Sequence, residues 1–316
     1  MNKLVVEYLD AIETSKEEGV VHNSPLKPEQ GFSGEAMLGA LQRLTSLACA
    51  DQGLCYLEVG VFQGLSLVSV SAANADVSCF GIDNFSQFDE GSQNKLIAES
   101  RIKKAGCANA NLIEADYEEA LERLSDHVLN LKVGLYFIDG PHDYRSQLMC
   151  LALIKPFLTQ NSLIVIDDAN YAHVRQANRD FLISHPEFGL LYESYTGKHP
   201  TEMSAGELKD CKKGWWDGVN IIMYDPAHSL NRIFPQTRQA KHLYFQDHNI
   251  HFHPYSEFAL QLLDLLAAFA RKPWRVPQRV FSITKDLLAN WKTSSERGYI
   301  NTYCDGIEKE RKAKLK

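Results

Sequence analysis

Between residues 54 and 184, short apolar runs alternate with amphipathic segments, and no other feature constrains the fold as strongly. The apolar runs predict buried strands at 54–59, 77–82, 110–113, 133–138 and 162–166. Helical patterns follow them at 66–73, 94–105, 117–124, 148–158 and 174–184. Two further strands are expected at 190–195 and 219–224. This alternation predicts an α/β fold, with a doubly wound, mostly parallel, seven-stranded sheet covered by helices on both faces.

The flanking regions predict helical additions to this sheet. Residues 1–34 form an N-terminal helical segment, residues 35–226 the central domain, and residues 227–316 a mainly helical C-terminal extension. A helix is expected over 35–50, and the polar stretch 197–214 is interpreted as a lid. The sequence leaves open whether the extension covers a site, mediates self-association, or does both.

Acidic residues stand at the carboxyl ends of successive predicted strands. In open parallel sheets, ligands bind outside that edge. Acids at so many strand ends indicate a binding site there. They are Glu58, Asp83, Asp116, Asp139, Asp167 and Asp168.

The turn after the first predicted strand indicates a site where the backbone itself comes close to a ligand. Gly60 and Gly64 permit a tight turn before a helix whose N-terminal amides face a ligand. A nicotinamide-binding turn carries a third, middle glycine. Here Phe62 occupies that place, and an acid precedes the first glycine. The pattern favours a cationic ligand over a pyrophosphate, with Asp83 accepting both hydroxyls of a ribose. An NAD-dependent oxidoreductase is the more distant alternative.

Four short motifs together resemble class I S-adenosylmethionine (SAM)-dependent methyltransferases. They are the Glu-x-Gly-x-x-x-Gly-x-Ser turn at 58–66, the Gly-Ile-Asp strand end at 81–83, the stretch 138–144 and the stretch 166–169. The branch typified by macrocin and mycinamicin O-methyltransferases is the most similar, over about residues 35–225. The resemblance implies a Rossmann-like methyltransferase fold.

The same resemblance implies roles for the residues of the first two motifs. Glu58, Gly60 and Gly64 would face the methionine part of SAM, and Asp83 would hold its ribose. Asp116 would lie near the adenine, or would instead cap the following helix. The full set expected to bind the cofactor is Glu58, Gly60, Gly64, Ser66, Asp83, Asp116 and Asp139.

The remaining motifs indicate a metal and a base. Three carboxylates that converge on one strand edge repel one another without a cation, and hard oxygen ligands suit Mg²⁺ or Mn²⁺. By resemblance, Asp139, Asp167 and Asp168 would be metal ligands, and His142 would be the general base beside a catalytic Asp139. Asn170 is an alternative ligand. Helix capping by Asp167 and Asp168, and a backbone-bonded loop role for His142, are the structural alternatives.

Other candidate residues carry less weight. Trp215 and Trp216 are interpreted as core or lid residues rather than as a stacking surface for an acceptor. His248, His251 and His253 are read as a polar loop rather than a metal site. Tyr144 and Arg145 are expected at the entrance of the site.

Bulk properties exclude several classes of function. The net charge is −7 and no basic cluster precedes the C-terminal residues, which argues against a nucleic-acid partner. The apolar stretch 258–269 is too short for a membrane span, and the N-terminus lacks a signal-peptide layout. The seven cysteines form no Cys-x-x-Cys pair, so buried reduced thiols and a cytoplasmic location are expected.

The expected function is therefore a SAM-dependent, divalent-metal-assisted O-methyltransferase. Its partner would be a small hydroxylated acceptor, such as a sugar or glycosylated metabolite, with no membrane partner and a possible homo-oligomer. The alternatives are a metal-independent SAM methyltransferase with another acceptor, and a non-catalytic nucleoside-binding protein of the same fold.

Overall fold

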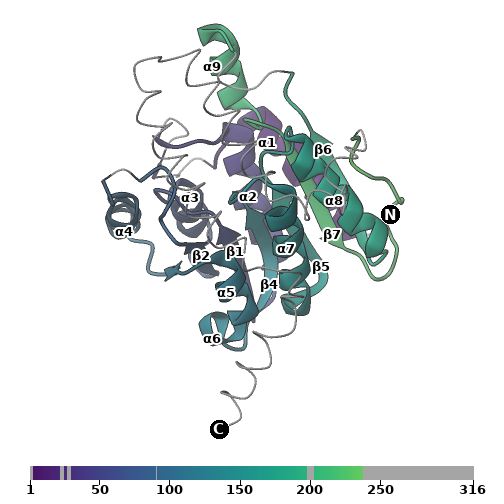
Figure 1. Cartoon of the computed structure of the whole chain (residues 1–316), viewed down its shortest axis with the longest axis horizontal. Coiled ribbons are helices and arrows are strands. Elements are labelled where there is room, and N and C mark those ends of the chain that lie inside the picture. Colours follow the sequence, from purple (N-terminus) through teal and green to yellow (C-terminus); the bar gives the residue numbers. More distant parts are fainter. Residues whose placement is uncertain (1–2, 22–24, 27–29, 90, 198–202, 238–316) are drawn as a thin grey trace, which may run out of the picture. The chain divides into compact units, whose positions relative to one another are not determined.

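The computed structural model describes residues 3–21, 25–26, 30–89, 91–197 and 203–237. The chain divides into two compact units, residues 1–240 and 241–316, and the second lies outside the described residues. The first unit is built on a seven-stranded sheet with the order β3-β2-β1-β4-β5-β7-β6 (Figure 1). Its strands are β1 (Leu54–Val59), β2 (Ser78–Asp83), β3 (Ala110–Glu114), β4 (Lys132–Ile138), β5 (Leu158–Ile166), β6 (Phe188–Ser194) and β7 (Val219–Tyr224).

The sheet is mostly parallel, as predicted. The pairs β1–β2, β2–β3, β1–β4 and β4–β5 all run parallel. β7 is inserted between β5 and β6 and pairs antiparallel with both. The start of β7 therefore lies at the edge of the sheet where β1, β2, β4 and β5 end.

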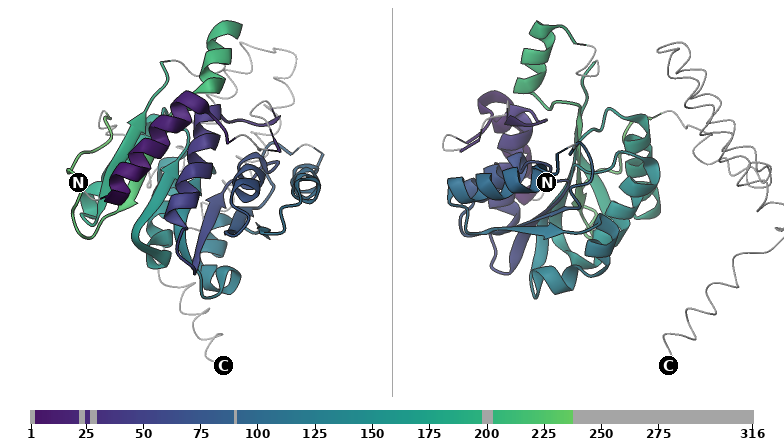
Figure 2. Two further views of the ribbon diagram at one scale, coloured as in Figure 1. Left: turned by 180° about the vertical axis from the view of Figure 1, so that it is seen from behind. Right: turned by 60° about the vertical axis from the view of Figure 1, so that its left-hand side comes forward.

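Helices cover both faces of the sheet, because the buried strands carry apolar side chains on each side. On one face, Tyr56, Leu135 and Val165 pack with residues of α1, α2 and α3. On the other face, Leu57, Tyr136 and Ile164 pack with α5 to α8 (Figures 1 and 2). The helices are α1 (Lys3–Glu18), α2 (Glu35–Ala48), α3 (Leu65–Ala73), α4 (Asn94–Ala105), α5 (Tyr117–Glu122), α6 (Leu124–Val128), α7 (Tyr144–Ile154), α8 (Ala172–Ser184) and α9 (Ala205–Lys213).

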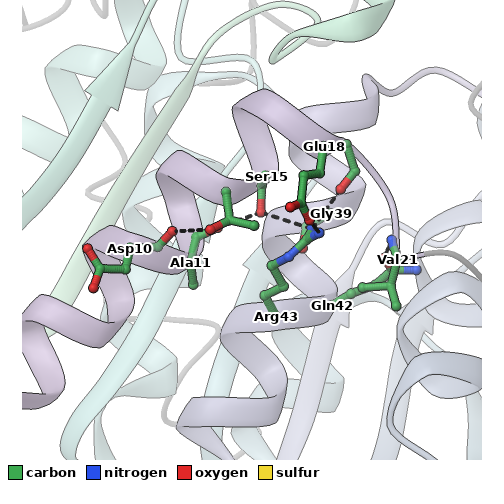
Figure 3. Close-up of polar contacts among 10 residues, drawn as sticks. Asp10, Ala11, Ser15, Glu18, Val21, Gly39, Gln42 and Arg43 are labelled. Carbon is green, nitrogen blue, oxygen red and sulfur yellow. Dashed lines mark hydrogen bonds and ion pairs between the residues drawn. The ribbon is translucent and has the colours of Figure 1, made fainter.

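Arg43 of α2 fixes the end of α1 (Figure 3). Its Nη1 donates to the carbonyl of Gly19 at 2.6 Å, and its Nη2 lies 2.9 Å from a carboxylate oxygen of Glu18. The neighbouring Gln42 accepts a hydrogen bond from the Val21 amide at 2.7 Å. The N-terminal segment is thereby attached to the same sheet face as α2.

Several predicted boundaries are corrected by local capping. The helix expected at 148–158 begins at Tyr144, because the Asp143 side chain caps it by accepting from the Ser146 amide. It ends at Ile154, before a short 3₁₀ turn that contains Pro156, and β5 begins at Leu158 rather than at residue 162. The helix expected at 117–124 is split into α5 and α6.

The polar stretch 197–214 contains a helix that the sequence did not predict. α9 starts with a reciprocal capping box between Ser204 and Glu207, which satisfies amides that a helix end leaves open. Beyond β7, residues 225–237 contain no helix, and the rest of the predicted C-terminal extension lies outside the described residues. The apolar stretch 258–269 and the three histidines at 248–253 lie outside the described residues.

The described residues contain no helix that is both long and apolar enough to cross a membrane. Six of the seven cysteines fall in these ranges, and all six are buried free thiols, as expected. Their burial raises the pKa of several of these thiols, for example that of Cys49 to about 12.

Candidate active site

A cavity of about 850 Å³ lies along the carboxyl edge of the sheet. Its walls are formed by the loops after β1, β2, β3, β4 and β5, by the residues just before β7 and by the segment that precedes α2. Of the predicted site residues, the lining includes Gly60, Ser66, Asp83, Asp116, Asp139, His142 and Asp168. Glu58, Gly64 and Asp167 are not part of the lining.

Gly60 brings the loop after β1 against the end of β4. It has a φ of +94°, and a Cβ at this position would lie 1.9 Å from the carbonyl oxygen of Asp139. Only glycine fits so close an approach. Gly64 also has a positive φ, but it precedes α3 and packs on Ala98 of α4. Gly64 therefore shapes the turn without reaching the cavity.

Asp83 organises the loop above it through its carboxylate. Its Oδ2 accepts from the amides of Val61 and Phe62, at 2.9 and 2.7 Å, and its Oδ1 accepts from the amide of Phe85 at 2.7 Å. A carboxylate offers about four lone-pair positions. Three are occupied by the protein's own backbone, so one remains, on Oδ1. That position is available to a hydrogen-bond donor from a ligand, and the role of Asp83 in holding a ribose stays a prediction.

Glu58 lies beneath the loop and is fully buried. It accepts hydrogen bonds from the hydroxyls of Tyr56 at 2.6 Å and Ser66 at 3.1 Å. Burial raises its pKa to about 8, against the opposing effect of those two hydrogen bonds. Ser66 lines the cavity, whereas Glu58 does not. Glu58 is therefore connected to the cavity through its hydrogen bond with Ser66.

Asp116 lines the cavity and also caps a helix, and its place near an adenine stays a prediction. It is exposed and lines the cavity, and its side chain also caps α5 by accepting from the Glu118 amide at 2.9 Å. Asp139 lines the cavity at the end of β4. Burial, and then the neighbouring charges of Asp167 and Asp168, raise the pKa of Asp139 well above its usual range.

His142, which follows β4, and Asp168, which follows β5, form a polar pair that lines the cavity. His142 Nε2 lies 2.7 Å from Asp168 Oδ2, and the imidazole stacks on the ring of Tyr171 with centroids 5.6 Å apart. When Nε2–H donates to Asp168, the Nδ1 lone pair is left to accept a proton. Asp168 is held in the left-handed region at φ +55°. The side chain of Asp167 instead accepts a hydrogen bond from the backbone amide of Asp168 at 2.8 Å.

Asn170 is committed to neighbouring protein groups. Its side-chain amide donates to Asp217 Oδ1 at 2.8 Å and to Thr196, and its Oδ1 accepts from the Thr196 amide. The described residues contain no group of three or more His, Cys, Asp or Glu side chains arranged to hold a metal ion. The predicted metal donors, as they stand in this structure, do not form a metal site.

The comparisons with known proteins give a family for the centre of the chain. Residues 57–169 match the model of a methyltransferase domain. The chain carries a methyltransferase domain. The predicted enzyme class, a SAM-dependent methyltransferase, is thereby confirmed; the macrocin and mycinamicin branch is not. No curated protein matches the chain.

Solved structures are similar to the chain at low identity. One is an O-methyltransferase from Bacillus cereus in complex with SAH, with 14% identity over 71% of this chain and 92% of that chain, and a TM-score of 0.44. Another is the O-methyltransferase TomG from Streptomyces achromogenes, involved in tomaymycin synthesis, in complex with SAM. It shows 15% identity over 71% of this chain and 91% of that chain, and a TM-score of 0.43.

Sequence reasoning missed several residues that line the cavity of the methyltransferase domain. Phe32 and Ser33 come from the segment before α2, and Asp217 from the segment before β7. Trp215 is buried in the core against Tyr192, as expected, whereas Trp216 lines the cavity. The antiparallel direction of β7 brings residues 216–217 to the ligand edge, and only the sheet topology reveals this.

Proposed function

We propose that the chain is a SAM-dependent O-methyltransferase that methylates a hydroxyl group of a small molecule. The observation that supports this proposal is the His142–Asp168 pair, which lines the same cavity as Asp83 and Asp116. A base held by a carboxylate therefore faces the cavity that carries the expected nucleoside residues.

The cavity fits SAM by its charge and by its backbone. Asp83 and Asp116 line it, and carboxylates attract the positive sulfonium and ammonium groups of SAM. Gly60 leaves the loop after β1 without a side chain where it approaches the end of β4. When bound, SAM supplies a methyl group that passes from its sulfur to an oxygen nucleophile, and the electron pair of the broken C–S bond stays on the sulfur.

His142 accepts the hydroxyl proton in this proposal. Asp168 holds the imidazole in one tautomer and stabilises the imidazolium that forms, as an orienting carboxylate does for other catalytic histidines. The cavity walls position the acceptor for in-line attack, which supplies a further part of the rate. Mg²⁺ or Mn²⁺ assistance, and a sugar or glycosylated acceptor, stay predictions, and we assign no step to a metal.

The test measures S-adenosylhomocysteine formation with the full chain and a panel of hydroxylated acceptors. We expect His142→Asn to lower kcat by about 10²–10⁴-fold, the usual contribution of a general base, while the Kd for SAM changes less than about twofold. His127→Asn, an exposed histidine of α6, is the matched control. Turnover by His142→Asn at the wild-type rate would remove the proposed base and would favour the non-catalytic alternative.

The same assay, run with a chelator and then with added Mg²⁺, tests the metal prediction. Activity that is lost with chelator and restored by Mg²⁺ supports it. Activity unchanged by chelator favours the metal-independent alternative.

A further inference from the structure

The loop after β5 contacts the proposed base at two points. This loop, residues 167–171, carries Asp168, whose Oδ2 lies 2.7 Å from His142 Nε2. It also carries Tyr171, whose ring stacks on the imidazole at an interplanar angle of 5° and a centroid distance of 5.6 Å. The orientation of the imidazole in the cavity therefore depends on the position of this loop.

The loop forms a tight turn that needs support from outside it. Asp168 has a φ of +55°, in the left-handed region, and the Tyr171 amide donates to the Asp168 carbonyl at 3.0 Å. A side chain in this region costs free energy and persists only where the surrounding structure holds it. The Asn170 amide donates to the Asp217 carbonyl at 3.0 Å. The loop is thereby attached to the residues before β7.

The residues before β7 are held in turn by the start of α2. The Ala36 amide donates to the Gly214 carbonyl at 3.2 Å. A Cβ on Gly34 would lie 2.1 Å from the same carbonyl oxygen and 3.1 Å from the Trp216 amide nitrogen. The two segments are therefore in close contact, and the first support of the loop extends to α2.

Arg175 supports the loop from α8. Its Nη1 donates to the carbonyl of Ala169 at 2.7 Å and to the carbonyl of Asn170 at 2.6 Å. A charged donor makes stronger hydrogen bonds than a neutral one. One guanidinium nitrogen therefore ties two consecutive carbonyls of the loop to the helix that follows it.

The Arg175 side chain is itself held in place. Its Cζ lies 5.2 Å from the centroid of the Tyr195 ring, and its Nε donates to the Gln236 carbonyl at 3.1 Å. The Tyr195 hydroxyl accepts from the side chain of Asn220, a buried residue of β7, at 3.1 Å. A guanidinium is planar, stacks on aromatic rings and donates in fixed directions. These contacts define one arrangement of Arg175.

We propose that Arg175 is a positioning residue for the methyl transfer: it fixes the loop 167–171 and, through Asp168, the orientation of the His142 imidazole. This inference rests on the proposed function and adds a residue to its machinery. Arg175 does not line the cavity. It therefore acts through the loop and not by contact with SAM or the acceptor.

Arg179 of the same helix offers a matched comparison. Its Nη1 donates to the Pro235 carbonyl at 3.4 Å, and its Cζ lies 5.4 Å from the centroid of the Phe234 ring. Both contacts are with the segment after β7, residues 225–237, to which Arg175 is also bonded. Arg179→Met therefore loosens this segment and leaves the bonds between Arg175 and the loop in place.

The first test requires no acceptor and follows amide hydrogen exchange of the full chain by NMR. We expect Arg175→Met to raise the exchange rates of the Asn170 and Tyr171 amides by about tenfold or more, and Arg179→Met to change them less than about twofold. The Kd for S-adenosylhomocysteine should stay within about twofold in both variants, since neither arginine lines the cavity. Unchanged exchange of the two amides in Arg175→Met overturns the proposal.

The second test measures kcat with the panel of hydroxylated acceptors. We expect Arg175→Met to lower kcat by about 10–100-fold, the usual cost of misplacing a catalytic group, and Arg179→Met by less than about threefold. Arg175→Lys keeps one charged donor, which cannot serve the loop and Gln236 together. It should show a smaller loss in the same direction, and it replaces Arg175→Met in both tests if that variant does not fold.

A double-mutant cycle separates positioning from a general loss of structure. Asp168→Asn removes the carboxylate, and asparagine adopts the left-handed region readily. In the Asp168→Asn background, Arg175→Met should lower kcat by less than about a further threefold, because the contact through which Arg175 acts is already lost. Two losses that multiply would show that Arg175 does not act through Asp168, and would overturn the proposal.

The remaining outcomes separate this inference from the proposed function. If wild type neither binds SAM nor methylates any acceptor, while Arg175→Met accelerates exchange in the loop, the proposed function fails and the role of Arg175 in fixing the loop stands. If wild type is active and Arg175→Met is equally active, the proposed function stands and the positioning role is wrong. Equal losses of kcat in Arg175→Met and Arg179→Met would assign the effect to the segment after β7 and not to the loop.

Discussion

At the scale of single residues, Glu58 has a consequence for stability. Its pKa is about 8 in the folded chain and 4.5 in its ordinary state, chiefly because the carboxyl is buried. The stabilisation that comes from holding this proton is complete below about pH 4.5 and is lost as the pH rises through 8. Glu58→Gln cannot ionise and keeps its bonds to Tyr56 and Ser66. We expect the Tm of the variant, relative to wild type, to rise between pH 5 and pH 8.

Thermal unfolding at several pH values measures this difference. Glu119→Gln, which changes an exposed carboxylate on α5, should show no such trend. A constant difference in Tm between Glu58→Gln and wild type across this range would show that Glu58 is ionised in the folded chain.

Gly60 gives a second prediction at the same scale. Gly60→Ala places a methyl group on the Asp139 carbonyl and should abolish SAM binding at concentrations that saturate wild type. Gly53→Ala is a matched control, because Gly53 also has a positive φ, of +89°, but a Cβ there meets no atom within 4 Å. Calorimetry of both variants with SAM makes the comparison. Equal affinity in the two variants would mean that the loop after β1 is not part of the SAM site.

At the scale of the elements, Arg43 holds α1 against α2. Arg43→Met keeps the apolar stem but loses the bond to the Gly19 carbonyl and the contact with Glu18. A hydrogen bond from a charged donor contributes about 1.5 kcal/mol or more, so Tm should fall by about 3–6 °C. Arg123→Met, with an exposed pair on the helix surface, should change Tm by about 1 °C or less. A similar small change for Arg43→Met would contradict the role of Arg43 in attaching α1.

Apolar runs and helix-forming stretches between turn residues were predictable from the sequence, and elements fixed by polar capping were not. The helix Asn94–Ala105 and the strands Leu54–Val59 and Val219–Tyr224 have the predicted boundaries. α9 was missed because a capping box, rather than an apolar stripe, starts it. Phe32, Ser33 and Trp216 were missed as site residues because they lie in irregular segments, and only the folded chain brings these segments together.

At the scale of the whole molecule, ligand binding should appear as a change in unfolding temperature. SAM at about 100 times its Kd stabilises the folded chain by about 2.7 kcal/mol, which corresponds to a Tm increase of about 5–11 °C. NAD should give no increase, since the turn after β1 lacks the middle glycine of nicotinamide-binding turns. A Tm increase with NAD and none with SAM would contradict the assignment of SAM as the cofactor.

The close contact of residue 34 with residues 214–216 also sets the order in which a growing chain can complete its cavity. These positions are about 180 residues apart, so at the usual rate of synthesis roughly 10–40 s separate them. The end of the cavity that carries Asp83 can assemble during this interval. The end that carries Trp216 exists only after the ribosome has added the last two strands.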